Sequence, residues 1–235
     1  MLYIHELDLI VLKDLEIKFP KVYKAIVEYY CVNNLYENFK FIEYSKNKKI
    51  SNLIANKIKN RLNLKSQWEN KVINLINKQI DVNFRHASFG YYPSYGLILD
   101  LSPKKMLNQL EIHIQLSLLG NFYSVRMANI NPNMCFVANG NYEEKGYGIE
   151  ELIVSPVNGF HSETFKTIVD IMEKTFEDAL FFPYSLDLLK LKGLSTYDEL
   201  PETPLGMAFF HPTMPINYYK PAKVVGNIDF GIENL

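Results

Sequence analysis

The chain has 235 residues, of which 48% are hydrophobic and 14% aromatic, so it can bury a substantial core, which excludes a disordered or fibrous protein. Its net charge of −1 conceals an asymmetry, because residues 1–80 carry 14 Lys and Arg against 8 Asp and Glu, whereas residues 81–235 carry 11 against 18. Charge asymmetry of this kind bears on association and solubility rather than on the fold.

Helices are predicted for the first third of the chain, where apolar residues recur every three to four positions. The pattern runs through residues 19–34, 48–64 and 66–79. Pro20 suits the opening turn of the first of these helices. Ser66 and Glu69 have the spacing of a capping box, in which each side chain accepts a hydrogen bond from the other residue's backbone amide. We therefore expect a helical N-terminal region over residues 1–79.

Strands are predicted after this region, where the apolar period falls to two. Residues 80–86 and 96–102 alternate in this way, and the clearest alternation spans residues 110–130. Gly120 and Asn121 can form a two-residue hairpin turn, because glycine readily adopts the positive φ that such a turn requires. This turn pairs Leu118 with Tyr123, Leu116 with Val125, Ile114 with Met127, Gln115 with Arg126 and His113 with Ala128.

The predicted hairpin has a second, polar face, which carries His113, Gln115, Ser117, Ser124 and Arg126. Alternation alone places polar residues on the outward face of a half-buried strand, so this set needs no catalytic explanation. The role of this face depends on whether other parts of the chain pack against it. Under packed helices His113 would be structural, whereas an open face would be a candidate binding surface.

Weaker strand patterns follow the hairpin at residues 134–138 and 149–157. Between them we expect a polar, glycine-rich loop that contains Glu143 and Glu144. The C-terminal tail is rich in proline, which confines strands to the edge of a sheet. It contains two candidate edge strands, at residues 205–210 and 223–230.

A long amphipathic helix is predicted over residues 162–182, because its apolar residues form one stripe, Ser162 can cap its start and Pro183 ends it. An antiparallel sheet with one apolar face needs such a cover. The prediction is therefore an α+β fold, in which a helical N-terminal region is followed by an antiparallel β-meander packed against this helix. The expected division is a helical region at residues 1–79 and a sheet-and-helix domain at residues 80–235.

Residues that could support catalysis or bind metal show no recognised spacing. The five histidines and the two cysteines, Cys31 and Cys135, occur in no zinc-ligand or redox pattern. No nucleophile elbow or phosphate-binding glycine loop is present. We therefore predict no catalytic residue, metal ligand or cofactor. The alternative is an enzyme whose site forms where His86, His113 and the aromatic loop at residues 89–96 converge.

Acidic residues gather in residues 143–202, which carry thirteen Asp and Glu against five Lys. A loop and a helix face could present them as one negative surface. Such a surface suits a basic protein partner, because complementary charge speeds association and fixes the register, although a solvated surface has the same composition. The candidate partner-binding residues are Glu143, Glu144, Glu150, Glu151, Glu173, Glu177 and Asp178.

The succession of hairpin, loop, strand and amphipathic helix over residues 80–210 resembles bacterial immunity-type proteins, which are encoded beside polymorphic or contact-delivered toxins. The segments that carry the resemblance are LEIHIQLSLLGNFYSVRM (110–127) and SETFKTIVDIMEKTFEDALFF (162–182). The resemblance implies a non-catalytic protein that binds one cognate toxin and blocks it. Many such proteins meet nuclease toxins with an acidic face. The resemblance assigns no functional residue.

A second alternative is nucleic-acid binding through residues 40–78, which carry ten basic and two acidic residues interleaved with aromatic ones. The isoelectric point near 6.5 favours a protein partner instead. The N-terminal segment lacks the pattern of a secretory signal peptide, and no stretch approaches the roughly 20 apolar residues of a membrane helix. We therefore expect a cytoplasmic protein with no membrane partner.

Overall fold

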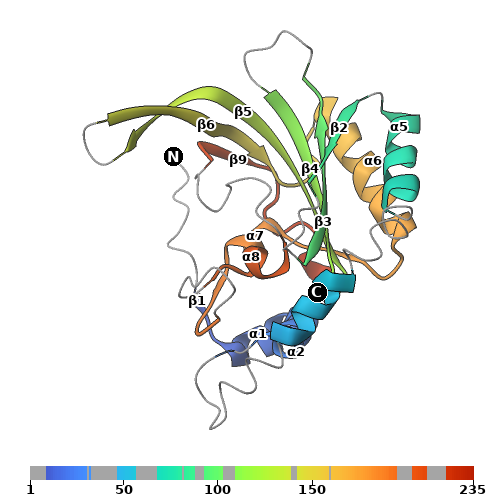
Figure 1. Cartoon of the computed structure of the whole chain (residues 1–235), viewed down its shortest axis with the longest axis vertical. Helices are drawn as coiled ribbons and strands as arrows, with labels where there is room; N and C mark the ends of the chain where they lie inside the picture. The colour runs from blue at the N-terminus through green and yellow to red at the C-terminus, as the bar shows by residue number, and fades with distance from the viewer. Residues whose placement is uncertain are drawn as a thin grey trace.

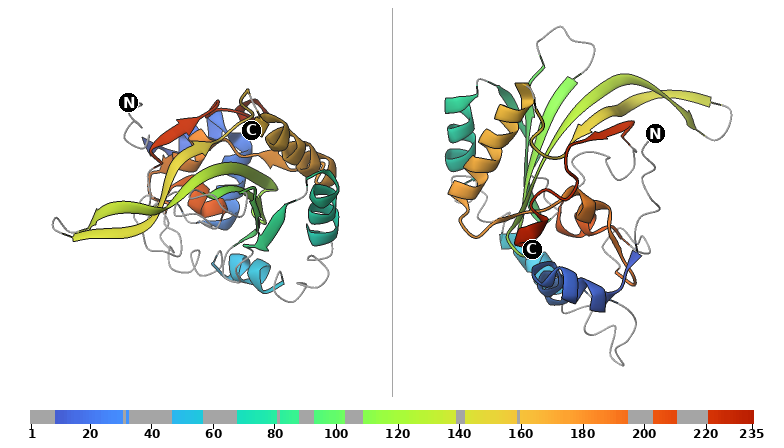
Figure 2. Two further views of the ribbon diagram at one scale, coloured as in Figure 1. Left: turned by 90° about the horizontal axis from the view of Figure 1, so that it is seen from above. Right: turned by 180° about the vertical axis from the view of Figure 1, so that it is seen from behind.

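The computed structural model describes residues 9–30, 32, 47–56, 68–80, 82–87, 93–102, 109–138, 142–158, 160–194, 203–210 and 221–235, with the backbone alone at residues 69–70, 132–138, 142–147 and 160. Helices and a mostly antiparallel sheet make up the fold, which confirms the predicted α+β class (Figure 1). The sheet stands between two groups of helices, one on each face, as Figure 1 and the view from behind in Figure 2 both show. Ser66 and Cys31 and the side chain of Glu69 lie outside the described residues.

The main sheet has seven strands within the described residues, in the order β2-β3-β4-β5-β6-β9, with β7 beside β5. Strands β2 to β6 form an antiparallel meander, as the alternating sequence predicts, whereas β7 and β9 join in parallel. The strands are β2 (Asn83–His86), β3 (Ser94–Asp100), β4 (Gln109–Ser117), β5 (Phe122–Ala138), β6 (Tyr142–Ile153), β7 (Leu180–Phe181) and β9 (Lys223–Val225).

The helices are α1 (Leu12–Lys18), α2 (Pro20–Tyr29), a helix at 47–56, the π-helix η1 (Trp68–Ile73), α5 (Asn74–Gln79), α6 (Phe160–Thr175), α7 (Tyr184–Leu188), α8 (Leu205–Phe209) and the short η3 (Ile232–Asn234). A small parallel sheet joins β1 (Leu9–Ile10) to β8 (Lys190–Leu191). The predicted N-terminal helices are thus present where the chain is described. The division of the chain at residue 79 stays a prediction.

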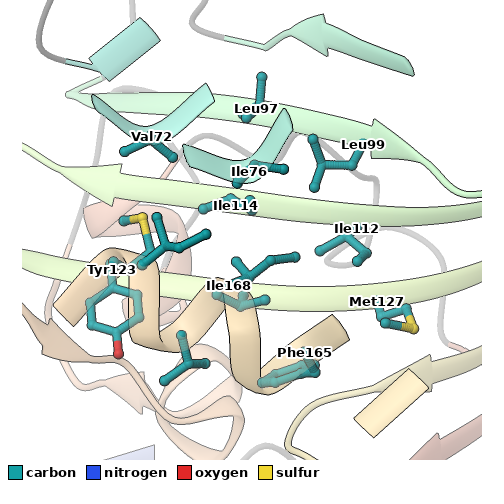
Figure 3. Close-up of a cluster of buried hydrophobic side chains, with 14 of the residues drawn as sticks. Val72, Ile76, Leu97, Leu99, Ile112, Ile114, Tyr123, Met127, Phe165 and Ile168 are labelled. Atoms are coloured by element: carbon teal, nitrogen blue, oxygen red, sulfur yellow. The ribbon is translucent and has the colours of Figure 1, made fainter. Parts of the chain in front are cut away.

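One face of the main sheet packs against η1, α5 and α6, and we call it the apolar face (Figure 3). The sheet supplies Leu97, Leu99, Ile112, Ile114, Tyr123, Val125 and Met127 to this face. Val72 and Ile76 of the N-terminal helices and Phe165 and Ile168 of α6 cover them, all four fully buried. The apolar stripe of α6 therefore packs on the sheet as the sequence predicts.

The opposite face of the sheet, which we call the polar face, is covered by α7 and α8. Figure 1 shows these two helices on the side of the sheet away from α5 and α6. Phe122 of β5 packs edge to face against Phe209 of α8, with ring centroids 5.1 Å apart. The same core cluster includes Val22 and Ile26 of α2. Both faces of the sheet are therefore buried at its central strands β4 and β5, whereas the residues of the edge strand β2 are exposed.

The β4–β5 hairpin has a longer loop than predicted, and the predicted strand pairing is wrong by two residues. Leu116 lies opposite Tyr123 and His113 lies opposite Arg126. The physical reason is Leu119, which is fully buried in the cluster under the polar face and therefore belongs to the loop. A shift of two residues keeps each side chain on its predicted face, because the side-chain period of a strand is two.

The weaker strands and the loop between them also differ from the prediction. β5 continues without a break through residues 134–138, and Glu143 and Glu144 lie in β6 rather than in a loop. The two strands bond to each other along this whole length, with register shifts after Asn129 and Asn131. Backbone hydrogen bonding to a partner strand thus overrides a polar, glycine-containing sequence.

The long helix α6 ends at Thr175 instead of residue 182. The chain turns at Glu177 and Asp178, and the following residues form β7, where Leu180 donates a backbone hydrogen bond to Asn121 and Phe182 donates one to Tyr123. In the tail, residues 205–210 do not form the predicted edge strand, because 205–209 form the buried helix α8. Residues 223–225 do form an edge strand, paired with β6.

Candidate functional site

The two histidines of the enzyme alternative do not share a face of the sheet. His113 of β4 lies opposite Ile98 of β3, whereas His86 of β2 lies opposite Leu97 of β3. Successive residues of a strand point to opposite faces and directly opposed residues share one. His113 is therefore on the polar face and His86 on the apolar side, so the predicted convergence of these two histidines is wrong. Residues 88–92 of the aromatic loop lie outside the described residues.

His113 takes part in a polar cluster on the polar face, in which His113 and Glu111 are buried and the Arg85 side chain, on the edge strand, is 63% exposed. Its Nε2 lies 2.9 Å from Oε2 of Glu111, two residues away on the same strand. Nη2 of Arg85, on β2, donates a 2.5 Å hydrogen bond to the other oxygen, Oε1 of Glu111. His113 and Glu111 are 3% and 4% exposed. Burial lowers the pKa of the His113 imidazole, while Glu111 raises it and Arg85 lowers it further.

Arg126, which lies opposite His113, has all three guanidinium nitrogens engaged although it is only 2% exposed. Nε and Nη2 donate to Oδ2 of Asp187 in α7, at 3.0 and 2.6 Å. Nη2 also donates to the backbone oxygen of Phe182, and Nη1 donates to that of Val125, both at 2.8 Å. The charge of Arg126 is thus satisfied internally, as a buried guanidinium requires.

Asp187, the acidic partner of Arg126 in this ion pair, is held in place by the residues packed around it. Burial raises the pKa of the Asp187 carboxyl, and the Arg126 guanidinium opposes that rise. Gly206 of α8 packs directly on Asp187, because a Cβ atom at residue 206 would lie 2.9 Å from Oδ1 and 3.0 Å from the Asp187 backbone. α7 and α8 are therefore joined to each other and to β5 at this point.

The polar face is consequently a paired interior surface and not an open one. Ser117, Ser124 and Arg126 are each at most 3% exposed. The hydroxyl of Ser124 donates to Oε1 of Gln115 at 3.4 Å, and the hydroxyl of Ser117 lies 3.0 Å from the Leu119 amide, which donates to it. Ser117 and Ser124 bond within the β4–β5 hairpin, whereas Arg126 holds α7 on the sheet. They do not line an exposed binding surface.

The predicted acidic residues on and after α6 are exposed. Glu173 stands on α6, and Glu177 and Asp178 form the turn that follows it. Glu163 and Asp170 are exposed on the same helix. The Tyr123 hydroxyl donates a 3.2 Å hydrogen bond to Oε1 of Glu173.

The remaining acidic candidates lie on β6, in a second group. Oε1 of Glu150 accepts a 2.8 Å hydrogen bond from Asn131, and Glu151 forms a 3.0 Å ion pair with Lys223. The backbones of Glu143 and Glu144 lie farther along β6, and their side chains are outside the described ones.

The two acidic groups are well separated along β5. Glu173 contacts Tyr123, whereas Glu151 lies opposite Asn129, six residues on, which at about 3.3 Å per residue places the groups about 20 Å apart. Figures 1 and 2 agree that the β5–β6 hairpin extends away from α6. The structure thus does not gather the acidic candidates into one surface.

The described residues contain no group of three or more His, Cys, Asp or Glu placed to hold a metal ion. None of the described helices is long and apolar enough to cross a membrane. Six of the ten basic residues in the segment 40–78 that could bind nucleic acid lie outside the described residues, and Lys49 within it is paired with Glu28 at 2.5 Å.

Comparisons with known protein families, with curated proteins and with solved structures found no match to this chain. The residue that sequence reasoning missed is Asp187, which lies 61 positions from Arg126. No local pattern marks it, because its partner is defined only by the packing of α7 on the sheet.

Proposed function

We propose that this protein is a non-catalytic binding protein of the immunity type, which neutralises a basic, toxin-like protein partner. The partner would dock on an acidic ridge, which we define as the exposed side chains Glu163, Asp170, Glu173, Glu177 and Asp178 on and just after α6. The proposal keeps three of the acidic residues expected from the sequence and leaves the β6 group outside the ridge.

The observation that carries the proposal is that most of this negative charge is not neutralised. Within the described part of the chain, no cation forms an ion pair with Glu163, Asp170, Glu177 or Asp178. The exposed cations on α6 are Lys166 and Lys174, so five acidic groups face two basic ones. A surface with this excess is complementary to a basic partner.

The helix that carries the ridge is rigidly seated, which favours binding because little conformational entropy is lost. Phe165, Ile168 and Met172 on its inner side are fully buried in the core under the apolar face. The Tyr123 hydroxyl also bonds to Glu173 and fixes the middle of the ridge. The acidic groups are therefore presented from a preorganised scaffold.

The resemblance to immunity-type proteins gives the proposal its partner class. It rests on the hairpin and the amphipathic helix, both of which pack in the same sheet-and-helix layer. Long-range attraction between a negative ridge and a basic toxin would accelerate association by about 10- to 1000-fold and would weaken as salt rises.

Co-purification with the product of the neighbouring gene tests the proposal. We expect that product to be toxic when expressed alone and to be retained by this protein. The double reversal Glu177→Lys with Asp178→Lys should lower the association rate at least about tenfold at low salt. The matched control is Glu16→Lys with Asp229→Lys, two exposed acidic residues outside the ridge, which should change the rate far less.

Two outcomes would overturn the proposal. A neighbouring product that is neither toxic nor retained removes the partner. Equal slowing by the ridge reversal and the control reversal would show that only net charge matters and that the ridge is no docking surface.

A further inference from the structure

The cluster on the polar face contains a histidine, His113, and an imidazole ordinarily changes its charge near neutral pH. His113 is directly opposite Arg126 across the β4–β5 pair, and Arg126 is the residue that holds α7. An imidazole titrates in this range, whereas guanidinium groups stay charged. His113 is therefore a neighbour, on one face of the β4–β5 pair, of the residue that attaches α7 to the sheet.

Two ion pairs lie on the same face as His113. Arg85 of β2, whose side chain is 63% exposed, pairs with Glu111 of β4, and Arg126 of β5 pairs with Asp187 of α7. The other titratable groups described on this face are Asp100 of β3, opposite Glu111 and exposed, and Tyr184 of α7, whose pKa burial raises to about 12. A proton on His113 would add a buried positive charge, which the exposed carboxylate of Asp100 offsets only weakly because water and salt screen it.

We propose that protonation of His113 is an acid-sensitive switch that loosens α7 and α8 from the polar face of the sheet. A charged imidazole opposite Arg126 places two like charges on directly opposed residues, which is destabilising. Glu111 offsets this only in part, because its other oxygen is already bonded to Arg85. The contact that gives way is the Arg126–Asp187 pair, since it joins the sheet to a helix of only five residues.

The direction of the effect follows from the lowered pKa of the His113 imidazole. Its pKa is lowered in the folded protein, mainly by burial, so an opened state binds the proton more tightly. The closed state is favoured above the ordinary imidazole pKa of about 6.5 and loses stability as the pH falls below it. For a closed state in which His113 stays unprotonated, the opening constant rises at most about tenfold between pH 7.5 and pH 5.5. The raised pKa of Asp187 opposes this rise, because the closed state binds that proton more tightly than the opened state does.

Hydrogen–deuterium exchange read by mass spectrometry tests the switch on the full chain. After correction for the intrinsic pH dependence of exchange, we expect peptides from residues 184–194 and 203–210 to lose up to about tenfold protection at pH 5.5 relative to pH 7.5. Peptides from α6, on the other face, should lose much less. His113→Gln, which cannot take up the proton, should abolish the difference, whereas His86→Gln, an exposed histidine on the other side of the sheet, should preserve it.

Three results would overturn the switch. One is equal loss of protection in α6 and in α7–α8, which would mean global acid unfolding. Another is a full pH effect in folded His113→Gln. Where that variant fails to fold, an NMR titration of the wild-type imidazole decides, and a His113 pKa at or above 6.5 would contradict the proposal.

Discussion

On the apolar face of the sheet, the side chains under α6 are hydrocarbon or aromatic, whereas on the polar face the side chains under α7 and α8 include Glu111, His113 and Arg126. Both sets are almost fully excluded from water. The first face is held by nonpolar burial, which has no directional requirement. The second depends on ion pairs and hydrogen bonds, which must all be made because an unpaired buried charge is costly.

The comparison shows that a clean polar–apolar alternation does not imply a solvated face. Alternation records which side chains share a face, and the rest of the chain decides whether that face meets water. In this protein the residues that bind and surround Arg126 come from the C-terminal third, through Asp187 and Gly206, and α2 contributes Val22 and Ile26 to the same core cluster. The two faces should therefore respond differently to substitution.

The largest expected effect is on the apolar face, at Phe165. This ring is fully buried against the sheet and lies 6.5 Å from Phe181, centroid to centroid. Phe165→Ala leaves a cavity and should lower the free energy of unfolding by about 3–5 kcal/mol. Urea denaturation measures the loss, which should be the same at pH 6 and pH 8 because no titratable group is involved.

On the polar face, Arg126→Met should cost about 3 kcal/mol, the lower end of the range for breaking a buried ion pair. The lower end applies because the Asp187 side chain is 16% exposed and can be partly solvated. Denaturation in urea gives the value. A cost below about 0.5 kcal/mol, the range of ordinary surface substitutions, would mean that the pair does not hold α7.

Gly206→Ala tests the contact between α7 and α8. The added methyl group would lie 2.9 to 3.0 Å from atoms of Asp187, two of them in the backbone, so α8 must shift. We expect a loss of about 1–3 kcal/mol, typical of overpacking. Ala208→Gly in the same helix is a comparison without a clash, because it lowers stability only through a lost buried methyl group and the lower helix propensity of glycine. An unchanged midpoint for Gly206→Ala would show that the two helices are not in tight contact.

The smallest effect on stability is expected at the acidic ridge. Asp178→Asn changes an exposed residue that forms no ion pair within the described part of the chain, and it should alter the free energy of unfolding by less than about 0.5 kcal/mol. Its effect should instead appear in the salt dependence of partner binding. A large loss of stability would place Asp178 among the structural residues rather than the binding residues.

The sequence predicts the sheet and the faces of its strands, because the two-residue period depends only on local chemistry. It also predicts the stripe of α6, whose inner residues are buried. It does not predict the hairpin loop, since the choice between a two-residue turn at Gly120 and a longer loop depends on whether Leu119 finds a buried position in a distant cluster.

The site was less predictable than the fold, for a related reason. Arg126 stands out in the sequence only as a polar residue of a strand, and Asp187 has no visible pattern at all. Their pairing depends on how residues 184–209 pack on the sheet, which local propensity does not encode. The acidic residues were identified from the sequence, but their separation onto α6 and β6 follows from topology.

A double-mutant cycle on Arg126 and Asp187 tests most directly whether the polar face is a paired interior surface. Unfolding in urea would be measured for the wild type, Arg126→Met, Asp187→Asn and the double variant. The account predicts that the two single losses exceed the loss in the double variant by at least about 1.5 kcal/mol, because each single change leaves a buried charge unpaired. Losses that simply add would contradict it, since they would show that the two residues do not interact in solution.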